Sequence, residues 1–228
     1  MKRNIVVILL LFLYCSSFSQ KRADIGIFVG RSYYLGDLNT NIHFKESKMA
    51  LGAIYRHNFD YRWALRGSLI MGTLGCTDET SAYKYQLLRN ADFQTAFYDF
   101  TAQMEFNFFP YKPGDAKMNN SPYVAAGFTF FMATDCPFPF QVAIPFGVGY
   151  KFNIAKKLSA GFEWTFRKSF TDLLDYTTGF DDIPVLGVDY PYQRGYIKNN
   201  DWYSMAGIFI TYKLFGFGNP CQSEYNKY

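Results

Sequence analysis

The chain has two histidines, His43 and His57, and they are the first residues to consider for catalysis or metal binding. A metal site needs several ligands that converge on one point, and a Ser-His-acid arrangement needs a serine beside the imidazole ring. Neither histidine lies in a pattern that supplies such neighbours. We therefore predict that the protein is not an enzyme and has no catalytic, cofactor or metal site. His57 is interpreted as a residue at the rim of the fold.

A second candidate for metal binding is a group of acids between residues 170 and 201. Calcium would suit such a group, because carboxylate oxygens are its usual ligands. The spacing of these acids lacks the regularity of a calcium-binding loop, so a solvated loop is the simpler interpretation. The acids are Asp172, Asp175, Asp181, Asp182 and Asp189.

The N-terminus has the layout of a secretory signal peptide. Lys2 and Arg3 precede an apolar run over residues 5–14, and small polar residues follow. The run of about ten residues is too short for a membrane-spanning helix, which needs roughly 20. We predict that residues 1–19 are removed. Cys15 then belongs to the removed peptide, because the bulky Tyr14 before it does not suit a lipoprotein site.

Composition and charge narrow the class of the exported chain. Removing Lys2 and Arg3 lowers the number of basic residues from 23 to 21, which is only two more than the 19 acidic residues, and this small excess gives no nucleic-acid signature. Aromatic residues make up 21% of the sequence, a bias that suits strands and membrane interfaces. No composition shift marks a linker, so we expect one domain over residues 20–215 and a tail over 216–228.

The elements that must hold any site are strands, because apolar and polar residues alternate along most of the chain. In the clearest case, Tyr98 to Phe108, every second residue is apolar and the residues between them are Asp99, Thr101, Gln103, Glu105 and Asn107. Each such segment is long enough to cross a membrane as a tilted strand, which takes about 9 to 11 residues. We predict eight strands, over residues 23–35, 49–59, 63–74, 98–108, 122–132, 141–153, 158–169 and 202–215.

The polar faces of these segments carry both signs of charge. A narrow barrel buries such a face in its lumen, where opposite charges can pair, and turns the apolar face to lipid. We therefore predict an all-β, eight-stranded antiparallel transmembrane barrel in the cell outer membrane, with a lumen filled by side chains. Asp99 and Glu105 are expected to pair with Arg56, Arg66 or Arg167. The charged residues of the polar faces are Asp24, Arg56, Arg66, Asp99, Glu105, Lys151, Glu163, Arg167 and Lys213.

Loop lengths predict the orientation of the barrel, because outer-membrane barrels have short periplasmic turns and longer outer loops. The connections 59–62, 109–121 and 154–157 are then periplasmic, as is the tail. Cys76 and Cys136 follow the outer ends of strands and could form a loop disulfide in this oxidising compartment. Cys221 in the tail is either an unpaired thiol or a tether to a partner subunit.

Several stretches resemble the PorG family, whose members are outer-membrane barrels of the type IX secretion system in Bacteroidetes-type bacteria. The resemblance covers almost the whole exported chain. The matching stretches are 33–38 (YYLGDL), 62–67 (RWALRG), 105–108 (EFNF), 143–149 (AIPFGVG) and 163–172 (EWTFRKSFTD).

The resemblance implies a structural role, in which the barrel holds a periplasmic ring of PorK and PorN subunits against the outer membrane. Only the periplasmic turns and the tail would reach such a ring, and aromatic residues often dominate interface energy. The expected partner contacts are Tyr111, Lys112, Cys221, Tyr225 and Tyr228, and the other expected partner is outer-membrane lipid. Neither nucleic acid nor a small-molecule substrate is expected.

Two other functions remain open at this point. The chain could be a stand-alone small barrel whose outer loops bind ligands or surfaces, or a barrel enzyme that modifies lipid. Co-purification of ring proteins would separate the scaffold from the stand-alone barrel. An enzyme would show lipid turnover that is lost when His43 or His57 is replaced.

Overall fold

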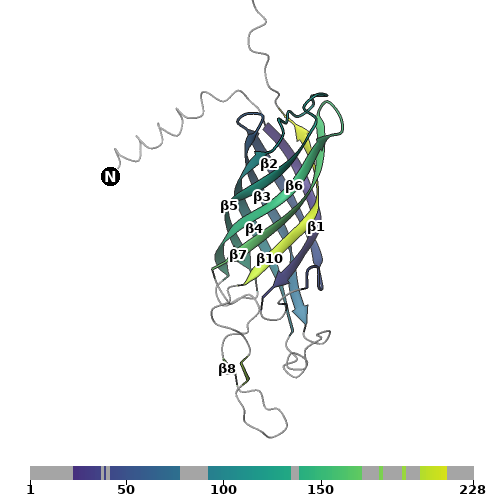
Figure 1. Ribbon diagram of the computed structural model, residues 1–228. Coiled ribbons are helices and arrows are strands. Elements are labelled where there is room, and N and C mark those ends of the chain that lie inside the picture. Colours follow the sequence, from purple (N-terminus) through teal and green to yellow (C-terminus); the bar gives the residue numbers. More distant parts are fainter. Residues whose placement is uncertain are drawn as a thin grey trace, which may run out of the picture.

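The computed structural model describes residues 23–36, 39, 42–77, 92–134, 139–170, 180–181, 192–193 and 201–214. Its body is a closed antiparallel barrel of eight strands, which confirms the predicted fold (Figure 1). Each strand pairs with the next one along the chain, and β10 pairs with β1 to close the sheet. The strands are β1 (Ala23–Leu35), β2 (Lys48–Asn58), β3 (Trp63–Thr77), β4 (Asp92–Asn107), β5 (Asn120–Ala133), β6 (Phe140–Asn153), β7 (Leu158–Ser169) and β10 (Trp202–Lys213).

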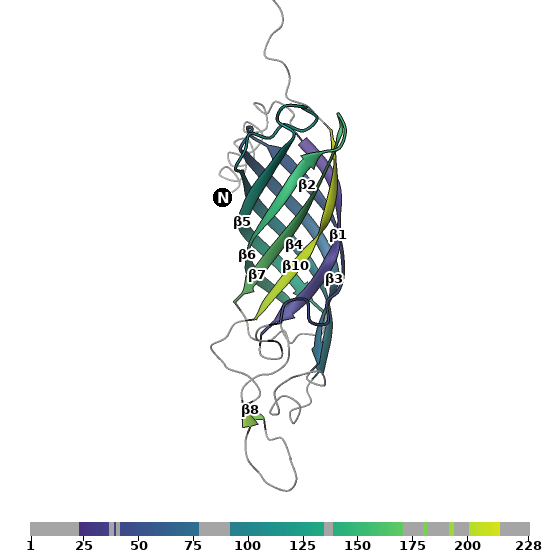
Figure 2. The ribbon, with the colours of Figure 1, turned by 45° about the vertical axis from the view of Figure 1, so that its right-hand side comes forward.

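Most strand boundaries agree with the predicted ones to within two residues, and β3 and β4 are the main exceptions. β4 begins at Asp92 instead of Tyr98, and β3 continues to Thr77, which pairs with Asp92. These two strands therefore extend past the others at the end with the long loops (Figure 2). The short strands β8 (Phe180–Asp181) and β9 (Tyr192–Gln193) pair with each other in the long loop before β10.

The alternation of polar and apolar residues did not predict the first residues of β4, because the inward side chains become apolar near the end of the barrel with the long loops. The loop lengths make this the outer end. Phe93 and Phe97 of β4 are buried there beside Leu74 of β3 and Tyr203 of β10. Neighbouring β5 adds Phe131, whose ring lies 5.1 Å from that of Tyr203. Gln94 of the same stretch is exposed on the outer wall, so the apolar side chains change face there and the period-two pattern found from Tyr98 onward does not continue back to the start of the strand. The lumen is therefore apolar toward the outer end and charged further in.

Small residues let the strands and the inward side chains fit inside this narrow lumen. A Cβ added at Gly127 of β5 would collide with the carbonyl oxygen of Ala102 and lie 2.7 Å from Gln103 Cα, both on β4. Those atoms are backbone and cannot move aside without separating the two strands. By contrast, a Cβ at Gly67 of β3 would meet no atom within 4 Å.

We expect Gly127→Ala to lower the free energy of unfolding by about 1–3 kcal/mol, the usual cost of overpacking. The matched change Gly67→Ala should be neutral or stabilise the barrel by about 0.5–1 kcal/mol, because alanine restricts the unfolded chain more than glycine does. Urea unfolding of both variants in lipid vesicles measures the difference. Equal midpoints for the two variants would show that β4 and β5 tolerate a side chain between them.

The outer wall of the barrel is apolar along the strands. Phe128, Leu69 and Ile27 are 71%, 60% and 60% exposed, although each is a large hydrophobic side chain. Aromatic residues gather near the ends of the strands with short turns, for example Trp63, Phe108 and Tyr212. Hydrocarbon is the medium that suits an apolar wall with aromatic residues at its edge. A closed sheet leaves no unpaired strand edge in that medium, so the chain is an outer-membrane barrel.

Candidate functional site: the filled lumen and the periplasmic cap

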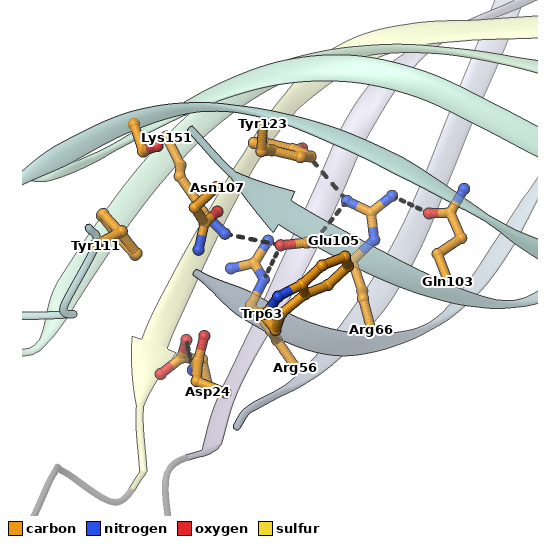
Figure 3. Close-up of polar contacts among 12 residues, drawn as sticks. Asp24, Arg56, Trp63, Arg66, Gln103, Glu105, Asn107, Tyr111, Tyr123 and Lys151 are labelled. Carbon is orange, nitrogen blue, oxygen red and sulfur yellow. Dashed lines mark hydrogen bonds and ion pairs between the residues drawn. The ribbon is translucent and has the colours of Figure 1, made fainter. Parts of the chain in front are cut away.

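Charged side chains fill the part of the lumen nearer the short turns, with Glu105 of β4 at their centre (Figure 3). Arg56 Nε of β2 lies 2.9 Å from Glu105 Oε2, and Lys151 Nζ of β6 donates a hydrogen bond of 2.8 Å to the same oxygen. Arg66 Nη1 of β3 lies 3.4 Å from Oε1. All four side chains are at most 2% exposed. One buried carboxylate therefore faces three cations.

Two further acids complete the charge balance of this group. Arg66 also donates to Glu163 of β7, and the Tyr123 hydroxyl of β5 donates to Glu163 Oε2 at 2.8 Å. Asp24 of β1 is buried and accepts a hydrogen bond of 3.0 Å from Asn58 Nδ2. The three acids Asp24, Glu105 and Glu163 thus offset the three cations Arg56, Arg66 and Lys151, so that the buried group has no net charge.

A separate ion pair lies closer to the outer end of the lumen. Arg167 Nε donates to Asp99 Oδ2 at 2.7 Å, and the Tyr203 hydroxyl donates to the same oxygen at 2.9 Å. The expected pairing of Asp99 and Glu105 with Arg56, Arg66 and Arg167 is confirmed by these contacts. The sequence did not indicate which acid pairs with which arginine, nor that Lys151 and Tyr123 join the group, because the register of eight strands decides which side chains meet.

The end of the barrel with the short turns is closed by residues 108–119, which fold across it. The Tyr111 side chain is 1% exposed, and its hydroxyl donates to Asn153 Oδ1 at 2.8 Å. Its ring lies 5.1 Å from Lys151 Nζ, so it also covers the charged group of the lumen. Burial raises the pKa of Tyr111 to about 12, which keeps the hydroxyl a neutral donor. Tyr111 is thus an internal packing residue of this segment.

A tight turn at 112–115 shapes the same segment. Asp115 N donates to Lys112 O at 3.1 Å, and Gly114 between them has a φ of 77°. A proline followed by a glycine with positive φ is the pattern of a type II turn. A side chain at Gly114 would also collide with the carbonyl oxygen of Lys156, so this turn packs directly against the turn 154–157.

Hydrogen bonds join this segment to the neighbouring turns. Tyr111 N donates to Tyr61 O at 2.9 Å, and Lys213 Nζ of β10 donates to Pro113 O at 2.8 Å. Asn153 Nδ2 donates to the carbonyl oxygens of Lys112 and Asp115 at 2.9 and 3.0 Å. We call residues 59–62, 108–119, 154–157 and Lys213 together the periplasmic cap, using the orientation set by the loop lengths.

The cap has more cations than acids on its surface. Its two acids are tied to backbone N–H groups: Asp60 accepts from Arg62 N and Trp63 N, and Asp115 from Lys117 N and Met118 N. These last two bonds hold the pKa of the Asp115 carboxyl below its usual value. Six cations surround them, so the surface has an excess of four positive charges. They are Arg62, Lys112, Lys117, Lys156, Lys157 and Lys213.

We expect Asn153→Ala to loosen the cap, because Asn153 is the residue that bonds both to the Tyr111 hydroxyl and to the turn at 112–115. Unpaired buried polar groups cost about 1–3 kcal/mol, so the segment should open more often. Trypsin cleavage after Lys117 in vesicle-embedded protein should become faster, whereas the Lys112–Pro113 bond resists trypsin in every variant. Asn120→Ala is the matched control, because in the described part of the chain the Asn120 side chain donates to the exposed Asn119 side chain and makes no bond to the turn at 112–115. Equal cleavage rates in both variants would contradict the role of Asn153.

The five predicted partner residues fall into three groups. Lys112 is half-buried at the cap surface and lies 3.7 Å from Asp115 Oδ2. Tyr111 points inward, so the cap surface near it is formed by other residues. Cys221, Tyr225 and Tyr228 lie outside the described residues, as do the predicted signal peptide, Cys136 and the acids Asp172, Asp175, Asp182 and Asp189. Cys76 is buried at the end of β3.

The two histidines lie on the outside of the barrel, at opposite ends. His43 lies in the loop after β1 and contacts Tyr33 of β1 and Trp164 of β7. His57 lies near the end of β2, next to Phe59. Within the described ranges, no group of His, Cys, Asp or Glu side chains is arranged to hold a metal ion. The described part also contains no helix long and apolar enough to cross a membrane.

The closed sheet, the apolar wall and the filled lumen define the protein as a small outer-membrane β-barrel located in the outer membrane. Within that class, the chain belongs to the family described as "Domain of unknown function (DUF6089)", whose model matches residues 2–225. Comparison with curated proteins gives no match.

Solved structures of bacterial barrels are similar to this chain. Neisserial surface protein A is 9% identical with a TM-score of 0.50, over 84% of this chain and 97% of its own. OprG from Pseudomonas aeruginosa is 11% identical with a TM-score of 0.46, over 87% and 99%. Ail from Yersinia pestis, solved with a heparin analogue, is 15% identical with a TM-score of 0.45, over 86% and 100%. At these identities the likeness to Neisserial surface protein A supports the fold alone.

Proposed function

We propose that this chain is a non-enzymatic outer-membrane subunit of a type IX protein secretion machine, which anchors a periplasmic ring of PorK and PorN type. The proposal rests first on the resemblance of five sequence stretches to the PorG family. In the same proposal, residues 1–19 are a removed signal peptide, residues 20–215 form the barrel and residues 216–228 are a periplasmic tail.

The lumen supports a structural role over transport or catalysis. Its charged side chains pair with one another, its outer part is packed with apolar side chains, and the cap closes the opposite end. Within the described strands and cap, these side chains occupy the space through which a solute would have to pass. The buried acids are also held by cations and hydroxyl groups, so they are poorly placed to act as a general base.

The observation that carries the proposal is the periplasmic cap itself. It is a folded surface, because Asn153, Lys213 and Tyr111 tie three separate turns together. Its excess of positive charge would suit an acidic surface on a partner and speed the encounter between them. A preordered, charged surface is what a membrane anchor needs in order to hold a ring without refolding.

The test is a double charge reversal, Lys117→Glu with Lys156→Glu, in the tagged full-length barrel. Both lysines are exposed on the cap, so the change should leave the barrel folded. Like charges at an interface cost several kcal/mol, so we expect recovery of the periplasmic ring proteins to fall by at least about tenfold. The matched control reverses two lysines at the outer end, Lys48→Glu with Lys168→Glu.

If the control variant recovered equally little ring protein, the loss would come from the changed net charge of the barrel and not from the cap. If the unmodified barrel brought down no ring protein, the secretion role would fall and the stand-alone barrel would replace it. Removing residues 218–228 tests the tail separately. Unchanged ring recovery after that deletion would exclude Cys221, Tyr225 and Tyr228 as contacts.

A further inference from the structure

The loop between β1 and β2 covers part of the barrel wall on its lipid-facing side. We call its residues 42–47 the outer strap. The ring of Phe44 stacks on that of Trp164 with centroids 5.9 Å apart, and it lies 4.7 Å from the ring of Tyr33. Tyr33 points outward in line with Ile27 and yet is 1% exposed, because the strap covers it.

The strap is held in an unusual backbone conformation. Phe44 and Glu46 have φ values of 62° and 47°, in the left-handed region that residues other than glycine rarely adopt. Hydrogen bonds beneath the strap fix its position: Trp164 Nε1 donates to the Tyr33 hydroxyl at 2.8 Å, and that hydroxyl lies 3.1 Å from His43 Nδ1. Strain of this kind persists where the surrounding structure imposes it, and it is frequent at ligand-binding sites.

An apolar groove of about 680 Å³ opens below Phe44 on the same wall. Trp164, Val148 and Phe162 form its sides, and it continues past Ile208 to the paired residues Tyr150 and Pro122. The groove exists because Ala206 is small: it lies between Arg31 and Trp164 in register, and both of those neighbours are large.

Arg31 is a cation on a wall that otherwise faces lipid. It is exposed, and in the described part of the chain its guanidinium donates to Ser47 O of the strap at 2.8 Å. A guanidinium has five N–H donors, so most of them remain available. A charge on the lipid face of a barrel is costly unless it reaches a polar group at the interface, and a phosphate matches the paired donors of arginine.

We propose that Arg31, Ala206, Trp164 and the strap form a binding site for a phosphorylated lipid of the outer leaflet, the lipid A part of lipopolysaccharide. The phosphate bonds to Arg31 near the outer rim, and one acyl chain lies over Ala206 in the groove under Phe44. The position of Arg31 suits the phosphate of an outer-leaflet lipid. β1 runs from the periplasmic end to the outer rim, and Arg31 lies close to its outer end. The site does not depend on the secretion role.

The test uses the full-length barrel folded in detergent and titrated with monophosphoryl lipid A, with bound lipid counted by native mass spectrometry. We expect one lipid on the unmodified protein. Arg31→Gln should bind at least about tenfold more weakly, since a charge-assisted hydrogen bond to phosphate is lost. Ala206→Leu should block the groove and bind no lipid. Lys168→Gln is the matched control, a cation of the same rim that lies over Trp202.

Arg31 is exposed, so Arg31→Gln should fold even if Ala206→Leu does not, and the gel mobility of unheated protein reports folding for each variant. Wild-type affinity in Arg31→Gln would overturn the proposal. So would an equal loss in Lys168→Gln, which would indicate general attraction to a basic rim. Equal binding of dephosphorylated lipid A, or of dimyristoyl phosphatidylglycerol, would also overturn it, because the site would then not select this lipid.

Discussion

Glu105→Gln is expected to lower the free energy of unfolding by about 3–5 kcal/mol, the largest effect of any single change considered for this barrel. The substitution keeps the shape of the side chain and removes its charge. Arg56, Arg66 and Lys151 would then remain buried with Asp24 and Glu163 as their nearby acids. An unbalanced buried cation costs far more than a surface charge, because the lumen cannot supply the solvation that water would. Unfolding by urea in lipid vesicles, followed by tryptophan fluorescence, measures the loss.

Two comparisons identify the cause of that loss. Asp115→Asn removes an exposed carboxylate of the cap but keeps the Oδ1 acceptor for Lys117 N and Met118 N, so it should shift the unfolding midpoint far less. Combining Glu105→Gln with Lys151→Met removes one cation as well as the acid, so the double variant should recover part of the lost stability. If Glu105→Gln unfolded at the wild-type midpoint, water would have to reach the lumen and solvate the three cations.

Leu69→Arg is expected to cost about 2–4 kcal/mol, the cost of an arginine on the lipid face near the middle of a barrel. Leu69 is 60% exposed on β3, so in water the same change would be nearly neutral. The loss should appear in the unfolding free energy and as a smaller fraction of protein that folds into vesicles. Ala155→Arg in the exposed turn 154–157 is the control and should fold like the unmodified chain. A neutral result for Leu69→Arg would mean that this wall does not face hydrocarbon.

The alternation of side chains was sufficient to predict the barrel, because a period of two is a local property of each strand. The segments 23–35 and 158–169 were predicted with the observed bounds. The charged lumen followed from the same pattern, since the polar face of every strand must point to one interior. The sequence did not predict the apolar layer around Phe97 and Phe131. These inward side chains are hydrophobic like their outward neighbours Tyr98 and Phe130, so no alternation distinguishes the two faces.

The cap and the strap were harder to predict because they depend on contacts between distant parts of the chain. Tyr111 was expected at the surface as a partner contact, because it is an aromatic residue of the connection 109–121, yet it packs into the barrel and bonds to Asn153. A useful signal was present in the Lys112 to Asp115 stretch, where Pro113 and Gly114 indicate a tight turn that folds back. No local pattern indicated that Phe44 would stack on Trp164, since the sequence gives no measure of how a loop folds over a wall.

The pairing of β1 with β10 also has a consequence for how the protein is made. These are the first and last strands of the barrel, so the sheet has two open edges until nearly the whole chain has been synthesised and exported. Contacts between residues so far apart in sequence form late and slowly. Open edges attract other strands, so the exported chain would have to be kept from aggregating before closure. A chain truncated before Trp202 would lack the strand that completes the barrel and should be degraded instead of inserted.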